Sequence, residues 1–131
     1  MQLLHRHGDR TPVHSLPGFL ENVSWNCSDS VLEDVAENDS LKLRKVYFEG
    51  RQALRGNCML GQLTKRGEEQ LRQLGRSFRE LYVEKLNLMP REMDQELMLL
   101  WSTDVPRTIR SAYHFLSGLY PNSVSLRFLR G

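Results

Sequence analysis

The stretch Arg6-His7-Gly8-Asp9-Arg10-Thr11-Pro12 follows a short apolar lead, Met1–Leu4, and the two together decide the fold that we predict. Residues 2–7 are typical of a buried strand, and a histidine between two arginines stands where that strand ends. Guanidinium groups hold phosphoryl oxygens in a fork geometry, and an imidazole is a competent nucleophile. The stretch therefore predicts a site for phosphoryl transfer at the carboxyl end of a strand.

The segment after Thr64 gives the clearest helix of the sequence. Thr64 can cap this helix, which we expect to end near Asn87. Gly75 inside it predicts close packing against a neighbouring element, because glycine is costly in a helix interior. The apolar stripe expected to form the core of the protein recurs at helical spacing and consists of Leu71, Leu74, Phe78, Leu81, Tyr82 and Leu86.

The remainder of the chain continues the alternation of strands and helices. A second buried strand is expected at 96–102, a second helix at 105–116 with Gly118 just past its end, and a third strand around 124–128. This order predicts an α/β fold, a parallel sheet flanked by helices. Since ligands bind at the carboxyl ends of parallel strands, His7 and Arg107 are expected at the same edge of the sheet.

Three stretches carry a resemblance to a known family. Arg6–Pro12 resembles the R-H-G-x-R-x-P signature of the histidine acid phosphatases, the branch of the histidine phosphatase superfamily that hydrolyses phosphomonoesters at low pH. Gly61–Gln70 resembles the segment that opens the family's first long helix, and Ser102–Ala112 resembles the segment that brings its third phosphate-binding arginine. The resemblance implies the phosphoglycerate mutase-like core of that family.

The same resemblance implies the site residues. His7 is the expected nucleophile, which forms a phosphohistidine that water then hydrolyses. Arg6, Arg10 and Arg107 are the expected phosphate-binding residues, which neutralise the phosphoryl charge. By contrast, we expect Arg110, one helical turn beyond Arg107, to contribute little to activity.

One element of the family's site is not found in the sequence. The family's proton donor is the aspartate of a His-Asp dipeptide, and none of these 131 residues forms such a pair. We therefore interpret residues 1–131 as the N-terminal part of a single catalytic domain, incomplete at its C-terminal side. Asp9 is a weak candidate for the donor, because the family accepts other residue types at this position. The alternative function is that of a truncated, non-catalytic fragment that binds phosphate or glycans.

The substrate class is a small-molecule or glycan phosphomonoester, but the subfamily stays open. The cysteine before Gly61 and residues 82–90 resemble the lumenal 2-phosphoxylose phosphatases, whereas residues 102–107 equally resemble the prostatic and lysosomal acid phosphatases. No cofactor is expected, and no metal either, because His5 and His7 lack a third ligand at a suitable spacing.

Charge and hydropathy narrow the set of partners. The chain has 18 basic and 16 acidic side chains, so its net charge of +2 argues against nucleic acid as a partner. The longest apolar run, Leu97–Trp101, is too short to span a bilayer. A membrane contact is therefore expected only through a segment outside these residues, and a homodimer stays open.

A polar insert at about 15–57 separates the first two motifs. Its three N-glycosylation patterns favour passage through the secretory pathway, with the protein in its lumen, in a lysosome or outside the cell; they begin at Asn22, Asn26 and Asn38. Cys27 lies in the insert and Cys58 just after it. They can pair with each other, pair with cysteines elsewhere, or stay free.

Overall fold

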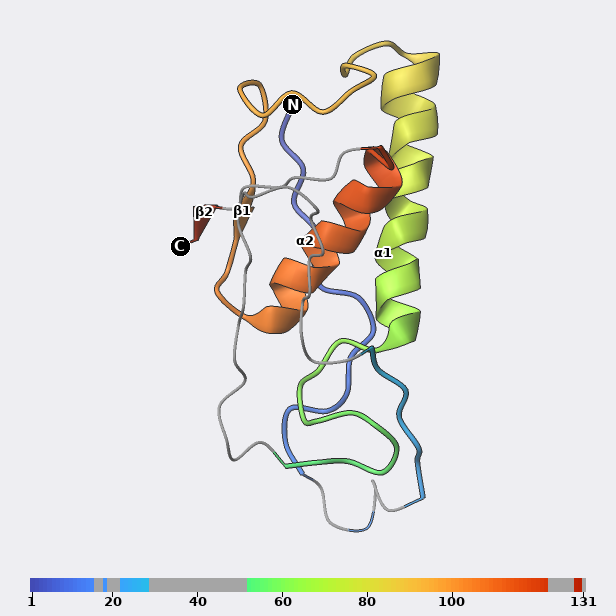
Figure 1. Ribbon diagram of the computed structural model, residues 1–131, viewed down its shortest axis with the longest axis vertical. Helices are drawn as coiled ribbons and strands as arrows, with labels where there is room; N and C mark the ends of the chain where they lie inside the picture. The colour runs from blue at the N-terminus through green and yellow to red at the C-terminus, as the bar shows by residue number, and fades with distance from the viewer. Residues whose placement is uncertain (16–17, 19–21, 29–51, 123–128, 131) are drawn as a thin grey trace.

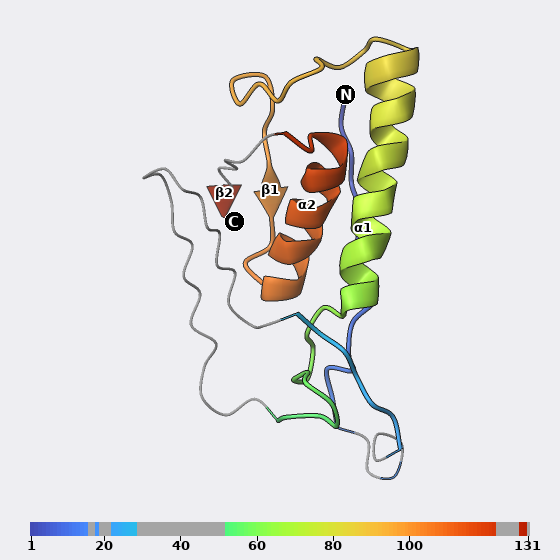
Figure 2. The same ribbon diagram turned by 45° about the vertical axis from the view of Figure 1, so that its right-hand side comes forward.

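The computed structural model describes residues 1–15, 18, 22–28, 52–122 and 129–130. Its elements, in chain order, are α1 (Lys65–Phe78), the π-helix η1 (Arg79–Lys85), β1 (Trp101–Ser102), α2 (Pro106–Leu119) and β2 (Leu129–Arg130). Helices α1 and η1 form one continuous rod, and α2 packs along its side (Figures 1 and 2). The two strands lie on the other side of α2, and the N-terminal segment runs beside both helices.

The start and end of the first helix agree with the sequence. The Thr64 hydroxyl accepts a hydrogen bond from the Gly67 N–H at 3.1 Å, which caps α1, and Glu68 stands in the first turn, where the helix dipole favours a negative charge. At the other end, Leu86 is the C-cap of η1, and Asn87 follows in the left-handed region at φ 52°. The expected end near Asn87 is confirmed.

The residues of the rod that face the core differ in part from those that the helical spacing predicts. A π-turn bonds residue i to i+5 instead of i+4, and Val83 within this π-helix is fully buried. Three of the six residues predicted as core are in fact 40% to 47% exposed, namely Leu74, Leu81 and Leu86. The other three are buried or half-buried, namely Leu71, Phe78 and Tyr82.

Two glycines bring α1 and α2 into backbone contact. A Cβ added to Gly75 would overlap the carbonyl oxygen of Phe115, and one added to Gly118 would overlap the carbonyl oxygen of Arg72. The close packing predicted for Gly75 is confirmed. The predicted helix boundary at 116 is wrong, because Gly118 serves the contact between the helices and lies inside α2, which continues to Leu119.

The apolar core fills the space between the rod and α2. Its buried members are Leu71, Val83, Phe115, Leu116, Leu119 and Tyr120. The partly buried side chains packed against them are Phe78, Met89, Met93, Met98 and Leu100.

The first predicted strand is absent as a strand. Residues 2–7 pair with no other strand in the described part of the chain, and Leu4 is 94% exposed. A strand needs a neighbouring strand for its backbone groups. Here the segment packs on α2, where the His5 ring stacks on Phe115 with centroids 5.3 Å apart. The prediction of a buried strand at 2–7 is wrong for this structure.

The second predicted strand is shorter and less buried than expected. Only Trp101–Ser102 pair as β1, and their partner is the parallel strand β2. Leu97 and Leu99 are 73% and 72% exposed, whereas Met98 and Leu100 pack on the core, so one face of this segment is buried. Helices with a parallel strand pair make an α/β arrangement. The strand predicted at 124–128 lies outside the described residues.

Of the insert, the structure describes residues 15, 18, 22–28 and 52–57, and these contain no helix. Cys27 and Cys58 are both buried and form a disulfide with Cα atoms 5.4 Å apart, so the structure has the mutual pairing among the alternatives. The side chain of Asn57 accepts from the Cys27 N–H and donates to the Cys27 carbonyl, both at 2.8 Å. The insert is thereby anchored next to the start of α1.

Candidate active site

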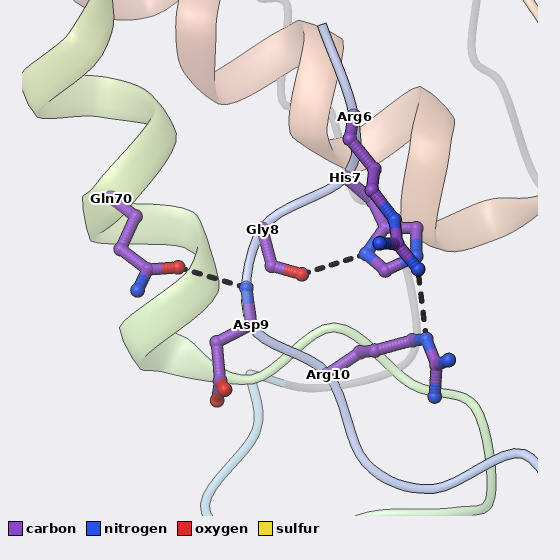
Figure 3. Close-up of a pocket in the computed structure, with 6 residues that line it drawn as sticks. All are labelled: Arg6, His7, Gly8, Asp9, Arg10 and Gln70. Atoms are coloured by element: carbon purple, nitrogen blue, oxygen red, sulfur yellow. Dashed lines mark hydrogen bonds between the residues drawn. The ribbon is translucent and has the colours of Figure 1, made fainter.

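A shallow cleft of about 380 Å³ opens at the first motif (Figure 3). The side chains and backbone that line it come from Arg6, His7, Gly8, Asp9, Arg10 and Gln70. Three of the four predicted catalytic residues, Arg6, His7 and Arg10, therefore meet in one cleft. Arg107, the fourth, is not among the lining residues.

The imidazole of His7 is held in one orientation from both of its nitrogens. Its Nδ1 lies 2.8 Å from the Gly8 carbonyl oxygen, which can only accept, so Nδ1 carries the proton. The Arg10 Nε–H donates to His7 Nε2 at 3.3 Å, which requires a lone pair on Nε2. The two contacts select the same tautomer, with a basic Nε2 beside a guanidinium (Figure 3).

Side chains from both helices hold the loop after His7. The Gly8 N–H donates to the buried Ser111 hydroxyl of α2 at 3.1 Å, and the Asp9 N–H donates to Gln70 Oε1 of α1 at 2.8 Å. Neither side chain is among the residues that the sequence predicts for the site. The signal was present, since Gln70 closes the second resembling segment and Ser111 stands near the end of the third.

Asp9 is fixed at the N-terminus of α1. The Thr64 N–H donates to the Asp9 carbonyl at 3.0 Å, and the Thr64 hydroxyl donates to Asp9 Oδ2 at 2.7 Å. A Cβ on Gly67 would overlap the Asp9 carbonyl oxygen, and a Cβ on Gly8 would overlap the Gly67 carbonyl oxygen. Close approach of two backbones is therefore what requires glycine at position 8.

The end of the loop is anchored on the turn before α1. Thr11 is fully buried, its N–H donates to the Gln62 carbonyl at 2.9 Å, and its hydroxyl donates to the Met59 carbonyl at 2.7 Å. The Gln62 N–H donates back to the Thr11 hydroxyl at 2.9 Å. The first and second resembling segments are thus joined by reciprocal hydrogen bonds.

Arg107 reaches the same region from α2. It is half-buried in the first turn of that helix, and its Nη1 lies 3.5 Å from the point where a Cβ on Gly61 would stand. Gly61 has φ 71°, and its N–H donates to the Pro12 carbonyl at 2.7 Å. The guanidinium of Arg107 therefore lies beside the turn at Gly61, and this turn contacts Pro12 at the end of the first motif.

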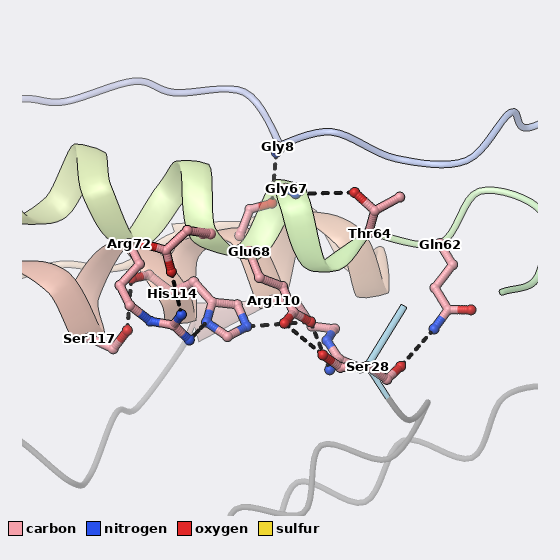
Figure 4. Close-up of polar contacts among 12 residues, drawn as sticks. Gly8, Ser28, Gln62, Thr64, Gly67, Glu68, Arg72, Arg110, His114 and Ser117 are labelled. Atoms are coloured by element: carbon pink, nitrogen blue, oxygen red, sulfur yellow. Dashed lines mark hydrogen bonds and ion pairs between the residues drawn. The ribbon is translucent and has the colours of Figure 1, made fainter. Parts of the chain in front are cut away.

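Arg110 occupies a buried polar cluster (Figure 4). Its Nη2 donates to Glu68 Oε1 at 3.1 Å, while the Ser28 hydroxyl donates to Glu68 Oε2 at 2.7 Å. His114 Nε2 lies 3.6 Å from Glu68 Oε1, and His114 Nδ1 lies 3.0 Å from an Arg72 nitrogen. Arg110 is 6% exposed and so joins the two helices, a role that its sequence position did not indicate.

The cluster keeps Glu68 ionised. Burial alone would raise the pKa of its carboxyl, but the hydrogen bonds from His114 and Ser28 and the charges of His114 and Arg110 outweigh burial and lower that pKa from 4.5 to about 2. In the part of the chain that the structure describes, no three metal-ligating side chains come together.

Glu68 should make stability depend on pH in a defined window. Because the folded-state pKa is depressed, its contribution to the free energy of unfolding is complete above about pH 4.5 and decreases as pH falls toward 2, by on the order of 3 kcal/mol. Urea unfolding of the wild type and of Glu68→Gln at several pH values checks this. The stability difference between the two proteins should shrink as the pH falls. Glu69→Gln is the control, since its ion pairs are exposed.

Comparison with known proteins identifies the family. The model of the histidine phosphatase superfamily (branch 2) matches residues 1–127. "Counting factor 60" of Dictyostelium discoideum is 44% identical over 132 residues, which cover 92% of this chain and 32% of that protein. "Lysophosphatidic acid phosphatase type 6" of Bos taurus is 29% identical, with coverage of 92% and 30%. "Putative acid phosphatase 10" of Caenorhabditis elegans is 42% identical over 69 residues, with coverage of 53% and 17%. The chain spans about a third of the length of the first two relatives. It belongs to branch 2 of the histidine phosphatase superfamily.

Proposed function

We propose that the protein is an acid phosphatase that hydrolyses phosphomonoesters through a phosphohistidine on His7. The observation that carries this proposal is the orientation of the imidazole, with its Nδ1 proton on the Gly8 carbonyl and its basic Nε2 in a cleft lined by two arginines. Two relatives are named as phosphatases, one as a lysophosphatidic acid phosphatase and one as a putative acid phosphatase, and these names support the same reaction.

We expect the reaction to proceed in two steps. His7 Nε2 attacks phosphorus, and the bond from phosphorus to the ester oxygen breaks. The ester oxygen leaves as an anion that takes a proton from water, and the Gly8 carbonyl stabilises the positive charge that develops on the ring. Arg10 moves from Nε2 to a phosphoryl oxygen, and Arg6 and Arg107 bind the others. Water then attacks the phosphohistidine, releases inorganic phosphate and restores the imidazole.

The proposal extends to the whole domain. Residues 1–131 form the N-terminal part of one catalytic domain whose parallel sheet is flanked by helices, and the substrate is a small-molecule or glycan phosphomonoester. The resemblance to the family implies that specificity between such substrates comes from the insert at about 15–57 together with a cap region.

Replacing Arg107 tests the phosphate-binding role. Arg107→Ala should lower kcat/KM for p-nitrophenyl phosphate by about 10²–10³-fold, because one donor to the developing charge is lost, and it should weaken inhibition by vanadate. The control is Arg76→Ala, which removes an exposed arginine paired with Glu69 on α1. If the two substitutions had equal effects, Arg107 would have no specific role in binding phosphate.

A second candidate function is phosphate or glycan binding without turnover. Asp9 is the acidic residue of the cleft, and its carboxylate already accepts a hydrogen bond from the Thr64 hydroxyl at the start of α1. A group held in this way is poorly placed to protonate a leaving alkoxide. The cleft would then retain its arginines and bind oxyanions, with little chemistry.

Secretory passage is part of the proposal, and glycan attachment tests it. Asn22 and Asn26 are exposed, while Asn38 lies outside the described residues. We expect a glycan on Asn22 when the protein is expressed with a secretory leader. Asn26 should be modified only before the neighbouring Cys27 closes its disulfide, since the Ser28 hydroxyl of its acceptor pattern is then bonded to Glu68. Glycosidase treatment should increase gel mobility.

Substitutions at the two sites make the glycan result specific. Asn22→Gln should abolish most of the mobility shift, and Ser24→Ala should do the same while keeping the asparagine. An unchanged mobility of the secreted wild type after glycosidase treatment would argue against the lumenal location.

In the part of the chain that the structure describes, no helix has the length and apolar character that crossing a membrane requires.

A further inference from the structure

The ion pair of Glu68 and Arg110 lies next to the contacts that hold the catalytic loop. Glu68 follows Gly67, whose carbonyl oxygen stands against Gly8, and Arg110 precedes Ser111, whose hydroxyl accepts from the Gly8 N–H. The pair thus joins the two helical turns that contact Gly8, one from α1 and one from α2. The Gly8 carbonyl in turn accepts a hydrogen bond from Nδ1 of the His7 ring.

Both oxygens of the Glu68 carboxylate have partners, and these partners come from two segments. Arg110 and His114 approach Oε1 from α2, and the Ser28 hydroxyl approaches Oε2 from the disulfide-bonded insert. The Glu68 and Arg110 side chains are 9% and 7% exposed. Figure 4 shows these side chains meeting along the edge of the two helices that lies away from the chain at Gly8.

Stability alone is a poor reason for such a pair. Replacing a buried ion pair by apolar side chains of similar size is often neutral or stabilising, because the two charges no longer need to be desolvated. What apolar side chains lack is direction, since a hydrogen-bonded pair fixes the relative rotation and slide of two helices. Misplacement of a catalytic group by about 1 Å can cost 10²-fold in rate.

We propose that Glu68 and Arg110 are positioning residues for His7. They hold α1 and α2 in the register that presses Gly67 and Ser111 onto Gly8, and thereby set the orientation of the imidazole. This inference rests on the proposed function, because it assigns the two residues to the turnover carried out by His7.

Variants of the pair separate positioning from stability. Glu68→Gln and Arg110→Met should each lower kcat for p-nitrophenyl phosphate by about 10- to 10²-fold with a smaller change in KM. The double variant Glu68→Met/Arg110→Met should regain the thermal stability lost by the single variants but not their kcat. Glu69→Gln, the adjacent residue with exposed ion pairs, should match the wild type. Recovery of kcat together with stability in the double variant would overturn the proposal, as would single variants with unchanged kcat.

A spectroscopic readout keeps the test independent of turnover. ¹⁵N NMR of the His7 ring should show the Nδ1–H tautomer in the wild type and in Glu69→Gln, and a mixture of tautomers in Glu68→Gln and in the double variant. If the wild type shows no hydrolysis, the proposed function fails and the tautomer populations still decide the positioning role. A wild-type tautomer pattern in all variants would overturn it.

Discussion

Replacing His7 with alanine should reduce hydrolysis of p-nitrophenyl phosphate by at least about 10³-fold, to near the background rate. The substitution removes the nucleophile and leaves Arg6, Arg10 and Arg107 in place. A rapid quench of the wild type into alkaline denaturant during turnover should trap phosphate on the protein, and heating in acid should release it. His7→Ala should trap none.

His14 provides the matched control for this experiment. It is an exposed histidine in the loop after the first motif, outside the cleft. His14→Ala should therefore keep the wild-type rate and the wild-type amount of trapped phosphate. Near-normal hydrolysis by His7→Ala would refute the phosphohistidine mechanism, whatever the effect at His14.

The chain should discriminate strongly between leaving groups. Loss of general-acid help costs typically 10²–10⁴-fold for a poor leaving group, whereas nitrophenolate leaves without a proton. Because Asp9 is held by Thr64, we expect residual hydrolysis of p-nitrophenyl phosphate and almost none of an alkyl phosphate such as glycerol phosphate. Measuring phosphate release from both substrates with the purified, folded 131-residue chain checks the ratio.

Asp9→Asn sharpens the leaving-group experiment. If the carboxyl of Asp9 donates no proton, the substitution should leave the ratio between the two substrates unchanged. Vigorous hydrolysis of the alkyl phosphate by the wild type, lost in Asp9→Asn, would identify Asp9 as the proton donor and contradict this expectation.

The sequence predicts the parts of this molecule that depend on local pattern. The cap at Thr64, the helix end near Asn87 and the close packing of Gly75 all follow from residues near one another in the chain. The gathering of Arg6, His7 and Arg10 in one cleft follows in the same way, since these residues lie within five positions.

The parts that the sequence did not predict depend on distant partners. The ion pair of Glu68 and Arg110 joins two helices, and each charge taken alone is typical of a solvent-facing position. The contact of Gly118 with α1 likewise depends on where the two helices cross, which the local sequence does not indicate. The π-turn that buries Val83 has no signature in an apolar pattern of ordinary helical spacing.

The capture of the Gly8 and Asp9 N–H groups by side chains has a consequence for ion selectivity. Many phosphate sites surround the anion with backbone amides, whose dipoles are fixed and shielded from solvent. Here these two amides are occupied, so attraction comes from arginine charges around a shallow cleft. Dissolved salt screens such charges, with a Debye length of about 8 Å at physiological ionic strength. The affinity of this cleft for phosphate is therefore set in part by the salt concentration of the compartment in which the protein works.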